Sequence, residues 1–144
     1  MENQKANRDK CLLKVAHAYG SIGKFSEASM IFEMVGKACV EDNLRKFSAR
    51  EHFLKAGLCH LAAGDVVAAT NGLSNYSNMS FDWKDSRESK LLTAITEAVD
   101  HVNEEAFSAA VHEYDTFVRL DQWKASILVK VKDTIKAHGD AEII

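Results

Sequence analysis

The sequence predicts an all-α fold, built as a tetratricopeptide-like stack of about three antiparallel helical hairpins with a capping helix at the C-terminal end. Proline is absent from the 144 residues, so no ring interrupts a helix. Hydrophobic residues make up 47% of the chain and recur three and four residues apart, which is the spacing of a helix face. Residues 11–36 give the clearest prediction of a hairpin, with a turn at Gly23-Lys24. Small residues and large apolar residues alternate there at the spacing of a tetratricopeptide unit.

The same pattern of apolar residues recurs twice at an offset of 41 residues, which indicates three copies of one hairpin. A helical bundle with accidental register is the alternative. The six positions compared are Ala16, Gly23, Phe25, Ala28, Phe32 and Val35 in the first copy. The second copy has Gly57, Gly64, Val66, Ala69, Leu73 and Tyr76, and the third has Ala98, Glu105, Phe107, Ala110, Tyr114 and Phe117.

Turn and capping residues give the order of the elements. Residues 1–7 are polar and expected to fray. Helices are expected at about 8–22, 24–40, 44–63, 66–76 and 86–102. A sixth helix follows the turn at 103–105 and ends near residue 118, and the last runs from near Asp121 until His138-Gly139 stops it. All of residues 1–144 are therefore expected to form one domain.

Several side chains are assigned to caps and to the core. Asp42 or Asn43 is expected to cap the third helix, and Asp65 the fourth. The third helix is expected to bury Leu44, Phe47, Leu54, Leu58 and Leu61. Phe81 and Trp83 are expected to hold the loop at 77–82 against the core, with an exposed contact patch as the alternative. The last helix is expected to bury Trp123, Ile127, Leu128, Val131 and Ile135, to turn Lys124, Lys130, Lys132 and Lys136 to solvent, and to close the end of the stack.

Composition argues against several functional classes. There is no run of about 18 apolar residues and no secretory leader, and Cys11, Cys39 and Cys59 are expected to be reduced and packed. These features predict a cytoplasmic protein. The sequence also has no phosphate loop, no H-E-x-x-H motif and no serine elbow, and its six histidines are scattered. We therefore expect no enzyme activity, no metal and no cofactor, and a binding surface instead.

Charge is distributed unevenly along the chain. Residues 1–64 contain ten basic and seven acidic residues, whereas residues 65–144 contain eight and fourteen. This split favours separate partners at the two ends and no nucleic acid. In the 41-residue register Lys5, Lys46 and Arg87 are equivalent, as are Lys14 and Lys55. Because Lys10 with Lys14 and Lys46 with Arg50 are spaced i, i+4, the first helices should present a basic stripe to an acidic helical bundle.

The opposite charge gathers near the turn of the last hairpin, at Glu97, Asp100, Glu104 and Glu105. Such an acidic surface suits a basic partner and should weaken with salt. Ordinary solvated side chains remain the alternative for both the acidic and the basic set.

Five segments resemble one known family, the alpha-SNAP family of soluble NSF attachment proteins, in its C-terminal half. The segments are Lys10-Cys11-Leu12-Leu13-Lys14-Val15-Ala16, Gly57-Leu58-Cys59-His60, Asp85-Ser86-Arg87-Glu88-Ser89-Lys90, Glu113-Tyr114-Asp115 and Arg119-Leu120-Asp121-Gln122-Trp123. Together they extend over almost the whole chain, and the last is the most specific. Since the family is about twice this length, the resemblance implies either an excised C-terminal domain or a natural short form.

The resemblance implies an adaptor for vesicle fusion that binds a syntaxin-type SNARE four-helix bundle and recruits and stimulates the hexameric ATPase NSF. Membrane contact would be peripheral, through SNAREs and through the absent N-terminal half. The SNARE-facing residues would be Lys10, Lys14, Arg50 and Arg87, and the repeat register adds Lys46. Glu97 and Asp100 would face NSF together with Glu104 of the acidic set, while His101 stands where the family tends to have an acid.

The C-terminal tail of the chain differs from the family pattern. Ile143 is the nearest counterpart of a family leucine tied to ATPase stimulation.

A tetratricopeptide scaffold of another class, holding an extended peptide, is the alternative function.

Overall fold

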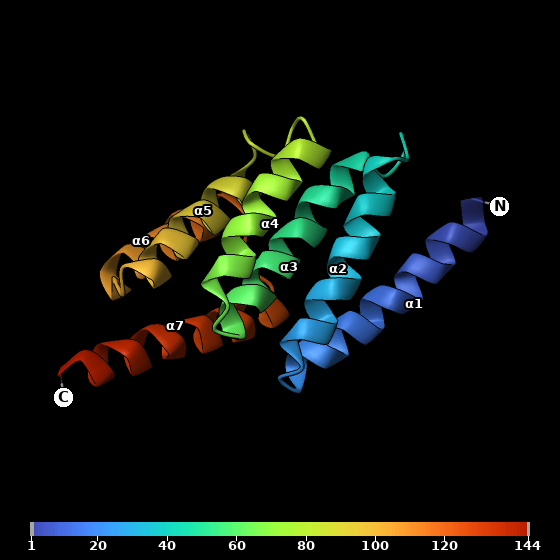
Figure 1. The fold of residues 1–144 in the computed structure, drawn as a ribbon. Coiled ribbons are helices and arrows are strands. Elements are labelled where there is room, and N and C mark those ends of the chain that lie inside the picture. The colour runs from blue at the N-terminus through green and yellow to red at the C-terminus, as the bar shows by residue number, and fades with distance from the viewer. Residues whose placement is uncertain (1, 144) are drawn as a thin grey trace.

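The computed structural model describes residues 2–143, with side chains placed from residue 4 to residue 140. Its helices are α1 (Glu2–Ser21), α2 (Phe25–Val40), the short 3-10 helix η1 (Lys46–Ser48), α3 (Ala49–Ala62), α4 (Val66–Met79), α5 (Arg87–Asp100), α6 (Glu104–Phe117) and α7 (Gln122–Ile143). Figure 1 shows the antiparallel hairpins side by side, with α7 crossing near one end of them. The described residues contain no strand, which confirms the prediction of an all-α hairpin stack with a C-terminal helix.

The first two hairpin turns lie where the sequence predicts them. Gly23 has a φ of +85° and Gly64 a φ of +81°, a left-handed conformation that glycine adopts without a steric penalty. Asp65 then caps α4 by accepting a hydrogen bond from the backbone N–H of Ala68. The third turn is different, because Val102 takes the positive φ of +52° and Asn103 caps α6.

The third turn lies three residues earlier than a second offset of 41 predicts. Helices α3 and α5 are each 14 residues long and start 38 residues apart, and the same holds for α4 and α6. The N-caps Ser48 and Ser86 are also 38 apart, as are Asp65 and Asn103. The 41-residue register is thus correct for the first two hairpins and wrong for the third. Tyr114, not Phe117, is the counterpart of Tyr76, and Phe117 is 63% exposed.

An aromatic cluster fills the core of the second hairpin. The rings of Phe53 and Tyr76 are stacked with centroids 4.5 Å apart, and Trp83 meets both rings edge-on. Trp83 is fully buried, as expected, and holds the α4–α5 loop against the core. Phe81 was expected to do the same, but it is 88% exposed, so the exposed alternative is correct for this residue.

The third helix begins five residues later than predicted. Asp42 accepts a hydrogen bond from the backbone N–H of Leu44, and Arg45 is held by Asp42 and by Asp9 of α1. These bonds form a turn followed by η1, instead of a helix capped by Asp42. Leu44 and Phe47 therefore precede the helix and are 77% and 62% exposed, whereas the predicted core residues of α3 are buried, namely Leu54, Leu58 and Leu61.

Helix α7 does not close the end of the stack. It packs mainly on α3 and also contacts α1, α6 and α5. Trp123 lies against Gly20 of α1 and donates a hydrogen bond to the carbonyl of His17 at 3.0 Å. Lys124 was expected to face solvent, but it is 3% exposed and its ammonium pairs with Glu51 of α3. The helix therefore ties the first hairpin to the second.

Both ends of the chain are more helical than predicted. Helix α1 begins at Glu2, within the segment that was expected to fray, and its Cys11 is exposed, not packed. Helix α7 continues through Gly139, although glycine in a helix interior costs about 1 kcal/mol relative to alanine. A Cβ at this position would be 3.8 Å from Val102 of the third hairpin. Within the described part of the chain, no helix combines the length and the apolar character needed to cross a bilayer.

Buried His52 should make stability depend on pH. Burial, and then the charge of Lys55, lower its pKa to about 4, and its Nδ1 has no hydrogen-bond partner among the described residues. The imidazole of the unfolded chain titrates near pH 6.5, so as the pH falls the unfolded state binds this proton before the folded state does. The free energy of unfolding should therefore be unaffected by His52 above pH 6.5 and should decrease between pH 6.5 and pH 4. We expect a loss of about 3 kcal/mol across this window, measured by urea unfolding. His52→Gln should flatten the pH profile, and an unchanged profile would contradict the assignment.

Candidate interaction surfaces

The basic residues predicted from the sequence lie on four different elements, α1, η1, α3 and α5. Lys10 and Lys14 are exposed one turn apart on α1. Lys46 lies in η1, not in a first helix, and Arg50 lies in the first turn of α3. Both of these side chains approach the exposed ring of Phe47, with the Lys46 ammonium 5.6 Å and the Arg50 guanidinium carbon 5.8 Å from its centroid. Lys46 and Arg50 therefore form one basic and aromatic cluster.

A buried ion pair fixes the segment before η1 against α1. Asp9 is 5% exposed and binds Arg45, which also donates to Asp42 at 2.7 Å. The hydrogen bond from Arg45 lowers the pKa of Asp42, so this carboxylate stays charged in mildly acidic solution. The backbone that leads to Lys46 is thus attached to the helix that bears Lys10 and Lys14.

Arg87 contacts a different aromatic ring from Lys46 and Arg50. It is the first residue of α5, is exposed, and places its guanidinium carbon 4.7 Å from the ring centroid of Phe117. The 38-residue spacing makes Lys84 the counterpart of Lys46, and Ala49 the counterpart of Arg87. The equivalence of Lys5, Lys46 and Arg87 was therefore wrong at the third position.

Lys55, the predicted equivalent of Lys14, has a side chain that is only 13% exposed and belongs to the interior. Its ammonium lies 3.1 Å from His17 Nε2, 3.9 Å from Glu51, and 5.9 Å from the ring centroids of Phe32 and Trp123. Burial lowers the pKa of Lys55, and burial together with Lys55 lowers that of His17. Lys55 therefore supports the packing of α7 and is not part of the basic surface.

The acidic residues are exposed at the opposite ends of the hairpins. Glu97 and Asp100 border a groove of about 400 Å³ between α4 and α5, beside the 70%-exposed Val67. Glu104, at the first position of α6, is approached by Lys132 at 3.7 Å and Lys136 at 3.9 Å. Part of its charge is therefore compensated within the chain. The backbone of Ile143 ends α7, and its side chain lies outside the described residues.

The segment Arg119–Trp123 has a clear structural role. Asp121 accepts a hydrogen bond from the backbone N–H of Lys124 at 2.7 Å and so caps α7. Trp123 then meets the rings of His17 and Phe32 edge-on, with centroids 4.9 and 5.4 Å away. This sequence therefore sets the place where α7 turns back onto α1 and α2.

Stacked helical hairpins, with exposed cations on α1 and α5, partly exposed cations on η1 and α3, and exposed carboxylates near the other hairpin ends, define a helical-repeat scaffold. The family model described as "Soluble NSF attachment protein, SNAP" matches residues 1–136, and the chain belongs to this family. The match favours this family over a tetratricopeptide scaffold of another class.

Curated relatives agree with the family assignment. A beta-soluble NSF attachment protein of Bos taurus is 38% identical over 98% of this chain and 47% of the relative. Alpha-soluble NSF attachment proteins of Vitis vinifera and Saccharomyces cerevisiae are 39% and 38% identical over 90% and 92% of this chain, and each match covers 45% of the relative. The chain thus spans about half the length of the curated relatives it matches.

Proposed function

We propose that this chain is an adaptor in vesicle fusion that binds SNARE complexes and recruits NSF. The family match over residues 1–136 is the observation that carries the proposal. The relatives are named as NSF attachment proteins, and one from Schizosaccharomyces pombe is named a probable vesicular-fusion protein. The separation of exposed basic and acidic residues on the described surface supports two different partners.

The proposed mechanism is one of positioning. Lys10, Lys14, Lys46, Arg50 and Arg87 bind the acidic surface of the SNARE bundle. Because Trp123 of α7 covers α1 at His17 and Gly20, this contact uses the N-terminal parts of the first helices. Glu97, Asp100 and Glu104, together with Ile143, face NSF, so the bundle is presented to the ATPase. In this proposal the chain performs no chemistry itself and reaches membranes from the cytoplasm through SNAREs.

Binding to NSF should be stronger than binding to SNAREs for this chain alone, because it spans only about half of its relatives and offers a shorter basic surface. Pull-downs of the immobilised chain with purified NSF and with a purified SNARE bundle test this, together with the rate of ATP hydrolysis by NSF. We expect retention of NSF, stimulated hydrolysis and weak, salt-sensitive retention of SNAREs. Strong SNARE retention without NSF retention would contradict the proposal.

A further inference from the structure

A groove of about 310 Å³ lies between the two helices of the third hairpin. Arg87 and Lys90 of α5 stand at its rim and are exposed. Its apolar lining comes from both helices, and small side chains leave it open in the middle. The lining includes Leu91, Ala94, Ala110 and Tyr114. Positions 87, 90, 91 and 94 follow the i, i+3, i+4, i+7 spacing of one helix face, so the groove runs along the hairpin.

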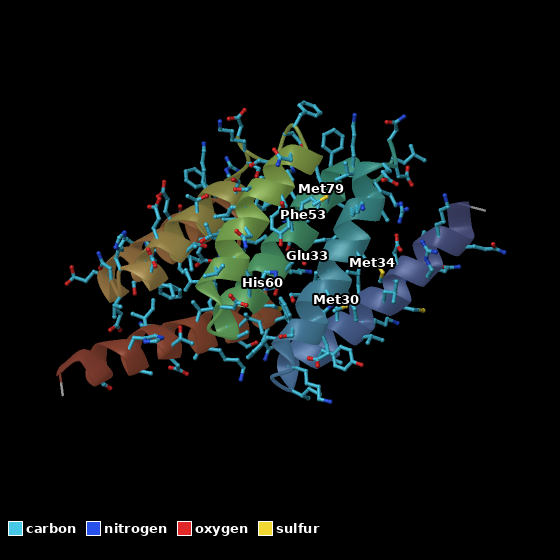
Figure 2. All side chains as sticks on the ribbon, in the orientation of Figure 1. Met30, Glu33, Met34, Phe53, His60 and Met79 are labelled. Atoms are coloured by element: carbon cyan, nitrogen blue, oxygen red, sulfur yellow. The ribbon has the colours of Figure 1, made fainter. Side chains whose placement is uncertain are left out.

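The second hairpin shows what covers the equivalent face. Through the 38-residue spacing, six of the eight lining positions correspond to buried residues of α3 and α4, namely Ala49, His52, Phe53, Ala56, Gly72 and Tyr76. The other two, Glu113 and Phe117, correspond to Asn75, which is exposed, and Met79, which is partly buried. Helix α2 lies on this face, so close that a Cβ on Gly36 would be 2.6 Å from the ring of Phe53. The Tyr76 hydroxyl donates to Glu33 of α2 at 2.6 Å. Figure 2 labels Glu33 on α2 and Phe53 on α3. In this repeat, a helix with a carboxylate therefore occupies the groove.

The third hairpin lacks such a helix within the described chain. Helix α7 turns toward α3 and α1 and leaves the groove open. Tyr114, the counterpart of Tyr76, is 4% exposed, and its hydroxyl makes no hydrogen bond to any described residue; the Lys124 ammonium is 5.8 Å from its ring centroid. The positions of Ala49 and His52 are taken by Arg87 and Lys90, and that of Asn75 by Glu113, so the lining gains two cations and one carboxylate and is net positive.

We propose that the α5–α6 groove binds an amphipathic α-helix of a partner protein. Apolar side chains of that helix pack over Ala94 and Ala110, where the small residues permit a close approach. An acidic residue of the helix pairs with Arg87 and Lys90, as charge complementarity requires. The site shares Arg87 with the proposed SNARE surface, but its apolar floor is separate from that surface.

The probe is a fluorescein-labelled peptide of residues 25–42 of this chain with Cys39→Ser, since this segment contains the helix that covers the equivalent face. Titration with the whole chain is followed by fluorescence anisotropy. We expect saturable binding, weakened at least about tenfold by Ala110→Leu, which fills the groove, and by Lys90→Glu, which reverses a rim charge. Ala109→Leu, on the exposed side of the same helix, should bind as the unmodified chain does.

The controls separate this site from the proposed function. Thermal unfolding checks that Ala110→Leu remains folded, and retention of SNAREs and NSF by this variant should be unchanged. Absence of saturable binding, or equal binding by Ala110→Leu and the unmodified chain, would overturn the proposal. Dodecyl phosphate that binds this groove while the peptide does not would also overturn it, by identifying an anionic lipid as the occupant.

Discussion

Lys14→Glu combined with Arg50→Glu should abolish retention of the SNARE bundle. If these cations face the acidic bundle, each reversal replaces an attraction with a like-charge contact, which costs several kcal/mol, so the pair should weaken binding by more than about 100-fold. The fold should tolerate both changes. Lys14 is exposed, and the ion pair of Arg50 with Asp82 is 4.0 Å long, a separation at which such pairs contribute about 0–1 kcal/mol.

Pull-downs at low and high salt measure this effect, with circular dichroism to check helix content. The matched control is Lys24→Glu with Lys37→Glu, which makes the same change in net charge at two exposed positions on or next to α2. This control should retain the bundle. Normal binding by the Lys14 and Arg50 variant at low salt would show that the basic surface of α1 and α3 is not the SNARE site.

Local signals in the sequence were sufficient to predict most of the helices. Gly23 and Gly64 mark turns because glycine adopts positive φ freely, and Asp65 and Ser86 are ordinary N-caps. The third turn has no glycine, and Val102 takes the positive φ there. Without that marker, the 41-residue spacing placed the third turn three residues too late, and Phe117 was aligned with Tyr76.

Other differences arise from contacts between distant parts of the chain. The late start of α3 depends on the bond between Arg45 and Asp9, which are 36 residues apart, so no local pattern predicts it. The burial of Lys124 could have been predicted, because it precedes Ile127, Leu128 and Val131 by three, four and seven residues and so lies on their face of the helix. Its partner Glu51 is 73 residues away and has no signal in the sequence.

The candidate surfaces show the same limit. Sequence identified the exposed charges Lys10, Lys14, Glu97 and Asp100, because charged helix positions outside an apolar stripe usually face solvent. It did not identify Phe47 beside Lys46 and Arg50, since a large aromatic residue is normally assigned to the core. Only the structure shows that the aromatic ring is part of the surface.

Trp83→Ala should cause the largest loss of stability among the changes considered. The indole is fully buried and packs edge-on against Phe53 and Tyr76, with centroids 6.0 and 5.4 Å away. Removing a large buried aromatic side chain typically costs about 3–5 kcal/mol, because packing is lost and a cavity remains. The indole N–H has no hydrogen-bond partner among the described residues, so the loss should come from packing alone.

Phe81→Ala is the matched control, because Phe81 lies two residues away in the same loop but is 88% exposed. It should change the free energy of unfolding by less than about 0.5 kcal/mol. Urea unfolding followed by circular dichroism at 222 nm, a wavelength that reports helix content, measures both variants without relying on tryptophan fluorescence. Equal losses for the two would mean that both aromatics hold the loop, as the sequence suggested. A loss confined to Trp83→Ala would show that, of these two aromatic residues, only Trp83 holds the loop against the second hairpin.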